Sequence, residues 1–126
     1  MEYRTDKEAR YLASDYNKYI KEKCRRNMTV INIDVLQWDY RKNILRIVES
    51  KHLNEHIGYW QLRALKLLAI VFGYCNSVAK RITFQIYIVR GNPPYKKIFV
   101  ENLITGTKTT LYNDDVKKFS ELDLSL

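Results

Sequence analysis

Apolar residues at helical spacing mark three segments of the chain as amphipathic helices. Residues 5–24 carry such a stripe, and Thr5 with Glu8 forms a capping box at its start. Residues 57–78 show the same periodicity, and residues 113–122 begin with Asn and Asp, which are favourable N-caps. The side chains expected to face inward are Ala9, Leu12, Ala13, Tyr16, Ile20 and Cys24 in the first helix, and Leu62, Leu65, Leu68, Ala69, Phe72, Cys75 and Val78 in the second.

Runs of β-branched and aromatic residues predict strands between these helices. Residues 28–39 and 44–51 are two such runs joined by a short polar linker, which is typical of a hairpin. Residues 83–90 form another run, which ends at a Gly-Asn-Pro-Pro turn. Residues 96–104 and 109–112 flank a Thr-Gly-Thr sequence and predict a second hairpin.

The order of these elements predicts an α/β protein. Both faces of the first hairpin carry apolar residues, so we expect a mixed central sheet flanked by helices on both sides. The chain has 126 residues, of which 46% are hydrophobic and 29% charged, as in an ordinary globular protein. We therefore expect a single domain over residues 1–126 that folds without disulfides or a structural metal.

Neither the longest apolar run nor the start of the chain indicates a membrane or secreted protein. Residues 65–72 are too few to span a bilayer, and the first residues lack the apolar core of a signal peptide. Cys24 and Cys75 follow no metal or redox spacing. We expect reduced thiols in or near the core of a cytoplasmic protein from a prokaryotic or viral setting.

The charge balance points to a polyanionic partner. Lys and Arg number 22 against 14 Asp and Glu, which gives a formal net charge of +8. Such an excess in a short chain favours nucleic acid, through phosphate contacts and counterion release. A basic domain without a polyanionic partner would have the same composition. The net charge therefore indicates nucleic-acid binding only together with a candidate site.

Three residues of the first predicted hairpin provide a candidate site. If the turn is centred on the linker, Asp34 lies directly opposite Glu49, with their Cβ atoms about 4.5–5.5 Å apart. Side chains alternate along a strand, so Lys51 shares the face of Glu49, and Ser50 points to the other side. A slip of one residue would place the two carboxylates on opposite faces. The register of this hairpin therefore decides whether a site exists.

Two opposed carboxylates are unfavourable unless something neutralises them. Their repulsion is about 1 kcal/mol in water and nearer 4 kcal/mol at a protein-like dielectric. A divalent cation removes it, and carboxylate oxygens with open positions suit Mg²⁺. Lys51 would then orient water or stabilise charge on a phosphate. The competing interpretation is an exposed Asp34 beside a surface Glu49–Lys51 ion pair.

Ile33-Asp34 followed by a hairpin and Ile47-Val48-Glu49-Ser50-Lys51 resembles the signature of the PD-(D/E)XK nuclease superfamily. The resemblance covers roughly residues 5–104 and implies a restriction-endonuclease-like αβββαβ core. It also implies Mg²⁺-dependent hydrolysis of DNA phosphodiester bonds, in which Mn²⁺ substitutes for Mg²⁺. In the family the Asp and Glu bind metal, the next residue lends its carbonyl and the Lys assists hydrolysis; these match Asp34, Glu49, Ser50 and Lys51.

Two further positions match accessory residues of the superfamily. Glu8 corresponds to a Glu on the first helix of many members, although the capping box explains it equally well. Gln61 corresponds to a Gln early in the second helix of RecB-like and Holliday-junction-resolvase-like members, or it is a solvent-facing polar residue. The sequence departs from the pattern in lacking a Pro before Asp34 and a separate first strand.

A nuclease of this kind needs a surface for DNA, and several exposed-type residues suit that purpose. Tyr59 is a candidate for base stacking, whereas Trp60 at the start of a long amphipathic helix is expected to be core. A chain this small would dimerise to cut two strands, and the substrate would be a junction, a flap or a single strand. The expected nucleic-acid-binding residues are Arg41, Lys42, Tyr59, Arg63 and Lys66.

Other functions remain open at this point. The string from His52 to His56 matches the H-x-x-E-H pattern of inverted zinc peptidases, which requires a helix and a third ligand. A nuclease-fold protein that binds DNA or assembles without turnover is the main alternative. A basic interaction module is a further one, in which the hairpin resemblance is accidental.

Overall fold

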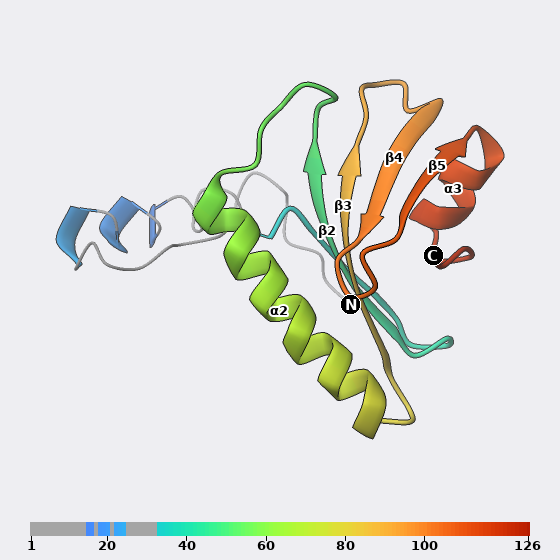
Figure 1. The fold of residues 1–126 in the computed structure, drawn as a ribbon, viewed down its shortest axis with the longest axis horizontal. Helices are drawn as coiled ribbons and strands as arrows, with labels where there is room; N and C mark the ends of the chain where they lie inside the picture. The colour runs from blue at the N-terminus through green and yellow to red at the C-terminus, as the bar shows by residue number, and fades with distance from the viewer. Residues whose placement is uncertain (1–14, 17, 21, 25–32) are drawn as a thin grey trace. The chain divides into compact units, whose positions relative to one another are not determined.

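The computed structural model describes residues 15–16, 18–20, 22–24 and 33–126 (Figure 1). The chain divides into two compact units, residues 1–30 and 31–126. In the first unit the described residues before Cys24 are helical, in agreement with the helix predicted there. Glu8 and its capping box lie outside the described residues.

The second unit is built on a five-stranded open sheet in the order β1-β2-β3-β4-β5 (Figure 1). Strands β2 and β3 are parallel, and all other neighbours are antiparallel. The element bounds are β1 Val35–Asp39, β2 Ile44–Lys51, α2 Tyr59–Val78, β3 Thr83–Arg90, β4 Lys97–Asn102, β5 Lys108–Tyr112 and α3 Asp114–Ser120. The predicted order of elements is therefore confirmed for this unit, and helix α2 makes the crossover between the parallel strands.

The turn between β1 and β2 fixes the register of the first hairpin. The Asp39 Oδ1 atom accepts hydrogen bonds from the backbone N–H groups of Arg41 (2.9 Å) and Lys42 (3.0 Å). The bond from Lys42 has the larger effect on the pKa of Asp39, and both bonds lower it. Asn43 closes the turn in the left-handed conformation, with φ at 55°. The ladder then runs from Asp39 opposite Ile44 to Val35 opposite Val48, which is the predicted register.

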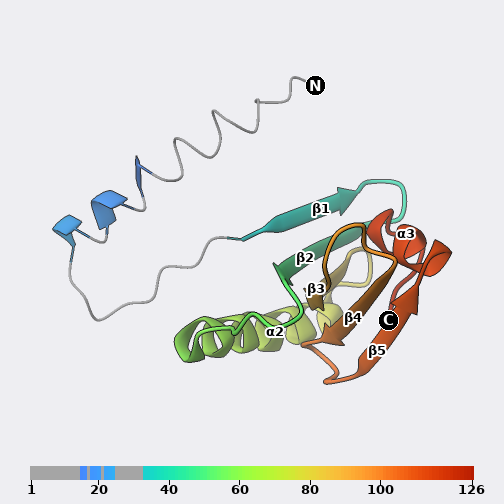
Figure 2. The ribbon, with the colours of Figure 1, turned by 90° about the horizontal axis from the view of Figure 1, so that it is seen from above.

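Each face of the sheet has its own hydrophobic core, and α2 and α3 lie on opposite sides (Figure 2). On the α2 side the buried residues are Ile47, Ile86, Leu65, Ala69 and Phe72. On the α3 side they are Val48, Tyr87, Val89, Ile98, Val100, Leu111, Val116 and Phe119. Successive residues of β2 thus enter different cores, which explains why this strand is apolar without interruption.

Some residues expected to be buried are exposed. The edge strand β1 leaves Val35, Leu36 and Trp38 between 40% and 59% exposed, because the described helices pack on the central strands. Val78, expected on the inner stripe of α2, is 58% exposed at the last turn of the helix. Cys24 and Cys75 are free and half-buried, close to what the sequence predicts. Within the described part of the chain, no helix is long and apolar enough to cross a membrane.

The C-terminal tail is held on the α3 side by Arg46, which is fully buried. Its guanidinium donates to Gln85 Oε1 (2.8 Å), to the carbonyl oxygen of Phe119 and to that of Leu124 (2.9 Å). It also lies over the Phe119 ring, 4.3 Å from the centroid. Burial lowers the pKa of Arg46 to about 10. No sequence pattern indicated this cluster.

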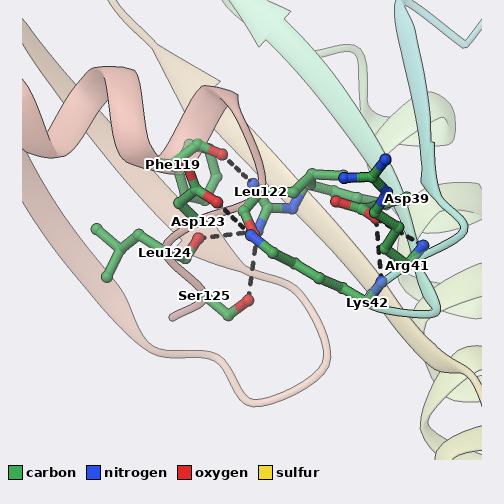
Figure 3. Close-up of polar contacts among 9 residues, drawn as sticks. Asp39, Arg41, Lys42, Phe119, Leu122, Asp123, Leu124 and Ser125 are labelled. Atoms are coloured by element: carbon green, nitrogen blue, oxygen red, sulfur yellow. Dashed lines mark hydrogen bonds and ion pairs between the residues drawn. The ribbon is translucent and has the colours of Figure 1, made fainter.

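The β1–β2 turn also contacts the C-terminal tail, through the exposed side chain of Lys42 (Figure 3). The Lys42 ammonium group donates to the carbonyl oxygen of Leu122 (3.0 Å) and pairs with Asp123. Both members of this ion pair are more than 40% exposed, so its contribution to stability is small. The buried Arg46 is therefore the stronger of the two attachments.

Candidate active site

The open end of the first hairpin brings Asp34 next to β2. Asp34 directly precedes β1, and its Oδ2 atom accepts a hydrogen bond from the Ser50 backbone N–H (3.0 Å). Continuing the observed register by one step places Asp34 opposite Glu49, on the face of the sheet that α2 covers. The Ser50 side chain lies on the other face and is exposed. The observed ladder thus has the predicted register up to Val35 and Val48, and Asp34 contacts β2 at the residue after Glu49.

Glu49 is the most deeply buried acidic side chain among the described residues, at 3% exposure. Its Oε1 atom accepts a hydrogen bond from the Gln61 amide (2.8 Å), so helix α2 reaches the site through this residue. Burial raises the pKa of Glu49, and the charge of Asp34 raises it further. The ion pair with Lys51 and the Gln61 hydrogen bond act in the opposite direction. Glu49 is thus a buried carboxylate that is incompletely neutralised.

Lys51 lies between two carboxylates. Its Nζ atom is 3.5 Å from Glu49 Oε1 and 3.5 Å from Glu55 Oε2, and its side chain is 15% exposed. Glu55 in turn accepts a hydrogen bond from the His52 backbone N–H (3.1 Å), which is the main cause of its lowered pKa. Arg90 donates to the Glu55 carbonyl oxygen. Nothing in the sequence pattern indicated the contact of Glu55 with Lys51, because an i,i+4 spacing brings side chains together on a helix and residues 52–58 contain none.

The segment after β2 does not have the geometry of a zinc peptidase site. Residues 52–58 contain no helix, whereas the H-x-x-E-H motif requires both histidines on one helical turn. His52 Nδ1 instead lies 3.1 Å from Asn92 Oδ1, and the Leu53 backbone N–H donates to the same oxygen (3.3 Å). These contacts attach the segment to the turn that follows β3.

The carboxylates have the chemistry of a partial Mg²⁺ site. No cluster of three or more His, Cys, Asp or Glu suited to a metal occurs among the described residues. Mg²⁺ commonly uses one or two carboxylates and completes its octahedron with waters and substrate phosphate oxygens. The hydrogen bonds found for Glu49 and Asp34 within the described residues use Oε1 and Oδ2, which leaves Oε2 and Oδ1 without one. The donor set of Asp34, Glu49 and the Ser50 carbonyl therefore suits this ion.

The five expected nucleic-acid-binding residues fall into two groups. Arg41 and Lys42 lie in the β1–β2 turn, roughly 17 Å of strand away from Asp34, so the prediction that they border the site is wrong. The reason is geometric, because the turn and the carboxylates occupy opposite ends of one hairpin. Tyr59, Arg63 and Lys66 lie in the first half of α2, on the same helix as Gln61, and all three are exposed.

Trp60 corrects a further expectation. It was predicted to be core, but it is 64% exposed, and its neighbour Tyr59 is 66% exposed. The inner face of α2 is formed by Leu65, Ala69 and Phe72, and Trp60 lies about 100° from the direction of Gln61 around the helix.

Comparisons with protein-family models, curated proteins and solved structures found no match. The class of protein is therefore defined by its own structure: an α/β fold with a five-stranded mixed open sheet and helices on both faces.

Proposed function

We propose that this protein is a Mg²⁺-dependent deoxyribonuclease of the PD-(D/E)XK type. The observation that carries the proposal is that Asp34 contacts β2 at the residue after the buried Glu49, with Lys51 paired to Glu49. A carboxyl group whose pKa is raised by burial and then by a second carboxylate is a recurrent feature of functional sites. The excess of basic residues, +8 in net charge, supports a polyanionic substrate.

Each side chain has a distinct role in the proposed reaction. Asp34, Glu49 and the Ser50 carbonyl would hold Mg²⁺, which when bound supplies Lewis acidity at a phosphate oxygen. Lys51 is held by two carboxylates with its ammonium group directed to the site, where it would donate to the attacking water or to the phosphate. Gln61 fixes the orientation of Glu49 through its 2.8 Å hydrogen bond.

The arrangement of elements supports the same proposal. A hairpin, a crossover helix and a parallel strand follow one another as β1, β2, α2 and β3, which is the order of the corresponding part of an αβββαβ core. The Gln61–Glu49 hydrogen bond favours a RecB-like or Holliday-junction-resolvase-like member. Most of the first predicted helix and residues 28–32 lie outside the described part of the chain.

Removal of the ammonium group should disable the enzyme. We expect Lys51→Met to lower the single-turnover rate of DNA cleavage in Mg²⁺ by about 10²–10³-fold, because a donor aimed at developing charge is lost. Lys108→Met makes the same change of charge on β5 and should leave the rate unchanged. The rate would be measured on a labelled oligonucleotide, with EDTA abolishing it. Equal rates for wild type and Lys51→Met would exclude the proposed role of Lys51.

The alternative is a nuclease-fold protein that binds DNA or assembles without turnover. The same assay separates the two functions, because this alternative predicts DNA binding with no cleavage in either Mg²⁺ or Mn²⁺. The intact combination of Asp34, Glu49 and Lys51 favours the enzyme, since a protein that only binds DNA gains nothing from two carboxylates that repel each other.

We propose that the active form is a homodimer. Leu67, Val71, Tyr74 and Val78 follow a 4-3-4 spacing along α2, and all are between 54% and 69% exposed. This spacing is that of a helix-pairing seam, and α2 carries no charge along it, so a second copy of the same helix is a suitable partner.

Disruption of this seam should produce a monomer. We expect Leu67→Glu to shift the mass in light scattering from dimer to monomer, because an unpaired carboxylate would be buried at the interface. Ser77→Glu adds the same charge to another side of α2 and should remain dimeric. A wild-type protein that is monomeric at all concentrations would contradict the proposal.

A further inference from the structure

Two exposed aromatic side chains directly precede Gln61 in the sequence, at the start of α2. The Tyr59 and Trp60 rings meet edge to face, with centroids 5.0 Å apart, and both side chains are about two-thirds exposed. The next residue, Gln61, donates its hydrogen bond to Glu49. The aromatic pair is thus joined to the proposed catalytic centre through consecutive residues of one helix.

A cation completes this cluster. The Arg63 Nη1 atom lies 3.4 Å from the Tyr59 hydroxyl oxygen, one helical turn further along α2. Helix α2 contains no Asp or Glu, and its charged residues are Arg63 and Lys66. A phosphate backbone that passes along this side of the helix would meet no repulsion from it.

Exposed aromatic rings beside positive charge suit stacking on nucleic-acid bases. In a continuous duplex the faces of each base are already covered by its neighbours, so a protein ring can stack only on a base that has left the helix. Stacking therefore selects for unpaired nucleotides, whereas the phosphate contacts of Arg63 and Lys66 do not discriminate.

We propose that Tyr59 and Trp60 form a stacking site for an unpaired nucleotide next to the cleaved phosphate, so the substrate is DNA with a single-stranded segment. The position of this nucleotide at the cleavage point rests on the proposed nuclease function. The stacking itself does not, because it requires neither metal nor turnover. The two can therefore be tested separately.

Binding is tested by tryptophan fluorescence. The chain has 2 tryptophans, so Trp38→Phe leaves Trp60 as the only one. In a Trp38→Phe, Glu49→Gln double variant in EDTA, a single-stranded oligothymidylate should quench the Trp60 emission. The blunt duplex of the same strand, at the same salt concentration, should quench it much less. No quenching by the single strand, or equal quenching by both, would overturn the stacking site.

Substitutions distinguish stacking from general attraction. Trp60→Ala should weaken single-strand binding by about 5- to 150-fold, the effect of losing one stacked base, and Tyr59→Phe should retain affinity because the ring remains. Tyr112→Ala is the control, since Tyr112 is 54% exposed on β5, at the opposite edge of the sheet from β1. Equal effects of Trp60→Ala and Tyr112→Ala would contradict the proposal, provided that circular dichroism shows all variants folded.

The substrate preference is tested on the active protein. Wild type should cut a flap or overhang faster than a blunt duplex, and Trp60→Ala should lower this ratio. An unchanged ratio in Trp60→Ala would contradict a role at the cleavage point. Quenching by single strands from a protein that never cuts DNA would support the stacking site and refute only the nuclease function.

Discussion

Glu49→Gln is expected to abolish Mg²⁺-dependent DNA cleavage while making the folded protein more stable. The substitution removes one of two proposed metal-binding carboxylates, so we expect at least about a 10³-fold loss of rate. It keeps the shape of the side chain and an oxygen that can accept the Gln61 hydrogen bond. It also removes a buried charge that Asp34 repels. An amide at this position is therefore better for the fold and unsuitable for the reaction.

The pH dependence of the free energy of unfolding should also show that the buried Glu49 charge destabilises the fold. The pKa of Glu49 is raised in the folded protein above its ordinary value of 4.5. A carboxyl group with a raised pKa favours folding most below the unfolded pKa, and this contribution is lost as pH rises through 4.5 to the folded pKa. The Gln amide in the Glu49→Gln variant has no proton to lose. The free energy of unfolding of the variant should therefore increasingly exceed that of wild type across this pH interval. The measurement is urea unfolding between about pH 4 and pH 7.

A matched control is Glu121→Gln, which alters an exposed Glu at the end of α3, on the face of the sheet opposite to that of Glu49. It should leave the cleavage rate unchanged. Cleavage by Glu49→Gln at the wild-type rate would contradict the proposed chemistry. Lower stability of Glu49→Gln at pH 7 would contradict the electrostatic description of the site.

Arg46→Met is expected to cause the largest loss of stability, about 3–5 kcal/mol in the free energy of unfolding. Methionine fills much of the volume, but it leaves Gln85 Oε1 and the carbonyl oxygens of Phe119 and Leu124 without their donor. Each buried acceptor that loses its partner costs about 1–3 kcal/mol. The contact of the guanidinium with the Phe119 ring is also lost. Urea unfolding gives the free energy directly.

Lys42→Met provides the control, because Lys42 attaches to the same tail from an exposed position. Its loss should cost no more than about 1 kcal/mol. Hydrogen exchange of residues 120–126 should accelerate in Arg46→Met and change little in Lys42→Met. A neutral effect of Arg46→Met would mean that the tail is held by its apolar contacts and that the buried guanidinium contributes nothing.

Local patterns were sufficient to predict most of the second unit. The polar linker between two β-branched runs determined the first hairpin and its register, and the predicted bounds of β2 and β3 agree with the structure. Two failures have a common cause. Sequence pattern shows that Leu36 and Trp60 are apolar, but burial depends on whether another element covers them, and in the described residues none covers them fully.

The candidate site was predictable only as far as it depends on local geometry. Alternation along β2 placed Glu49 and Lys51 on one face, and the position of Gln61 at the start of α2 brought it to them. Arg46 could not be predicted, because its partners on α3 and the tail come from distant parts of the sequence. Arg41 was misplaced although the predicted register already put it in the turn, at the opposite end of the hairpin from Asp34 and Glu49.

The most direct test of the central claim is a crystal structure of the protein with Mn²⁺, recorded with anomalous scattering. The proposal predicts a peak bound by Asp34, Glu49 and the Ser50 carbonyl, with metal–oxygen distances near the roughly 2.0–2.1 Å range of Mg²⁺ sites. The peak should disappear in Glu49→Gln. An empty site in crystals grown at saturating Mn²⁺, with Asp34 and Glu49 directed apart, would contradict the claim that this protein is a metal-dependent nuclease.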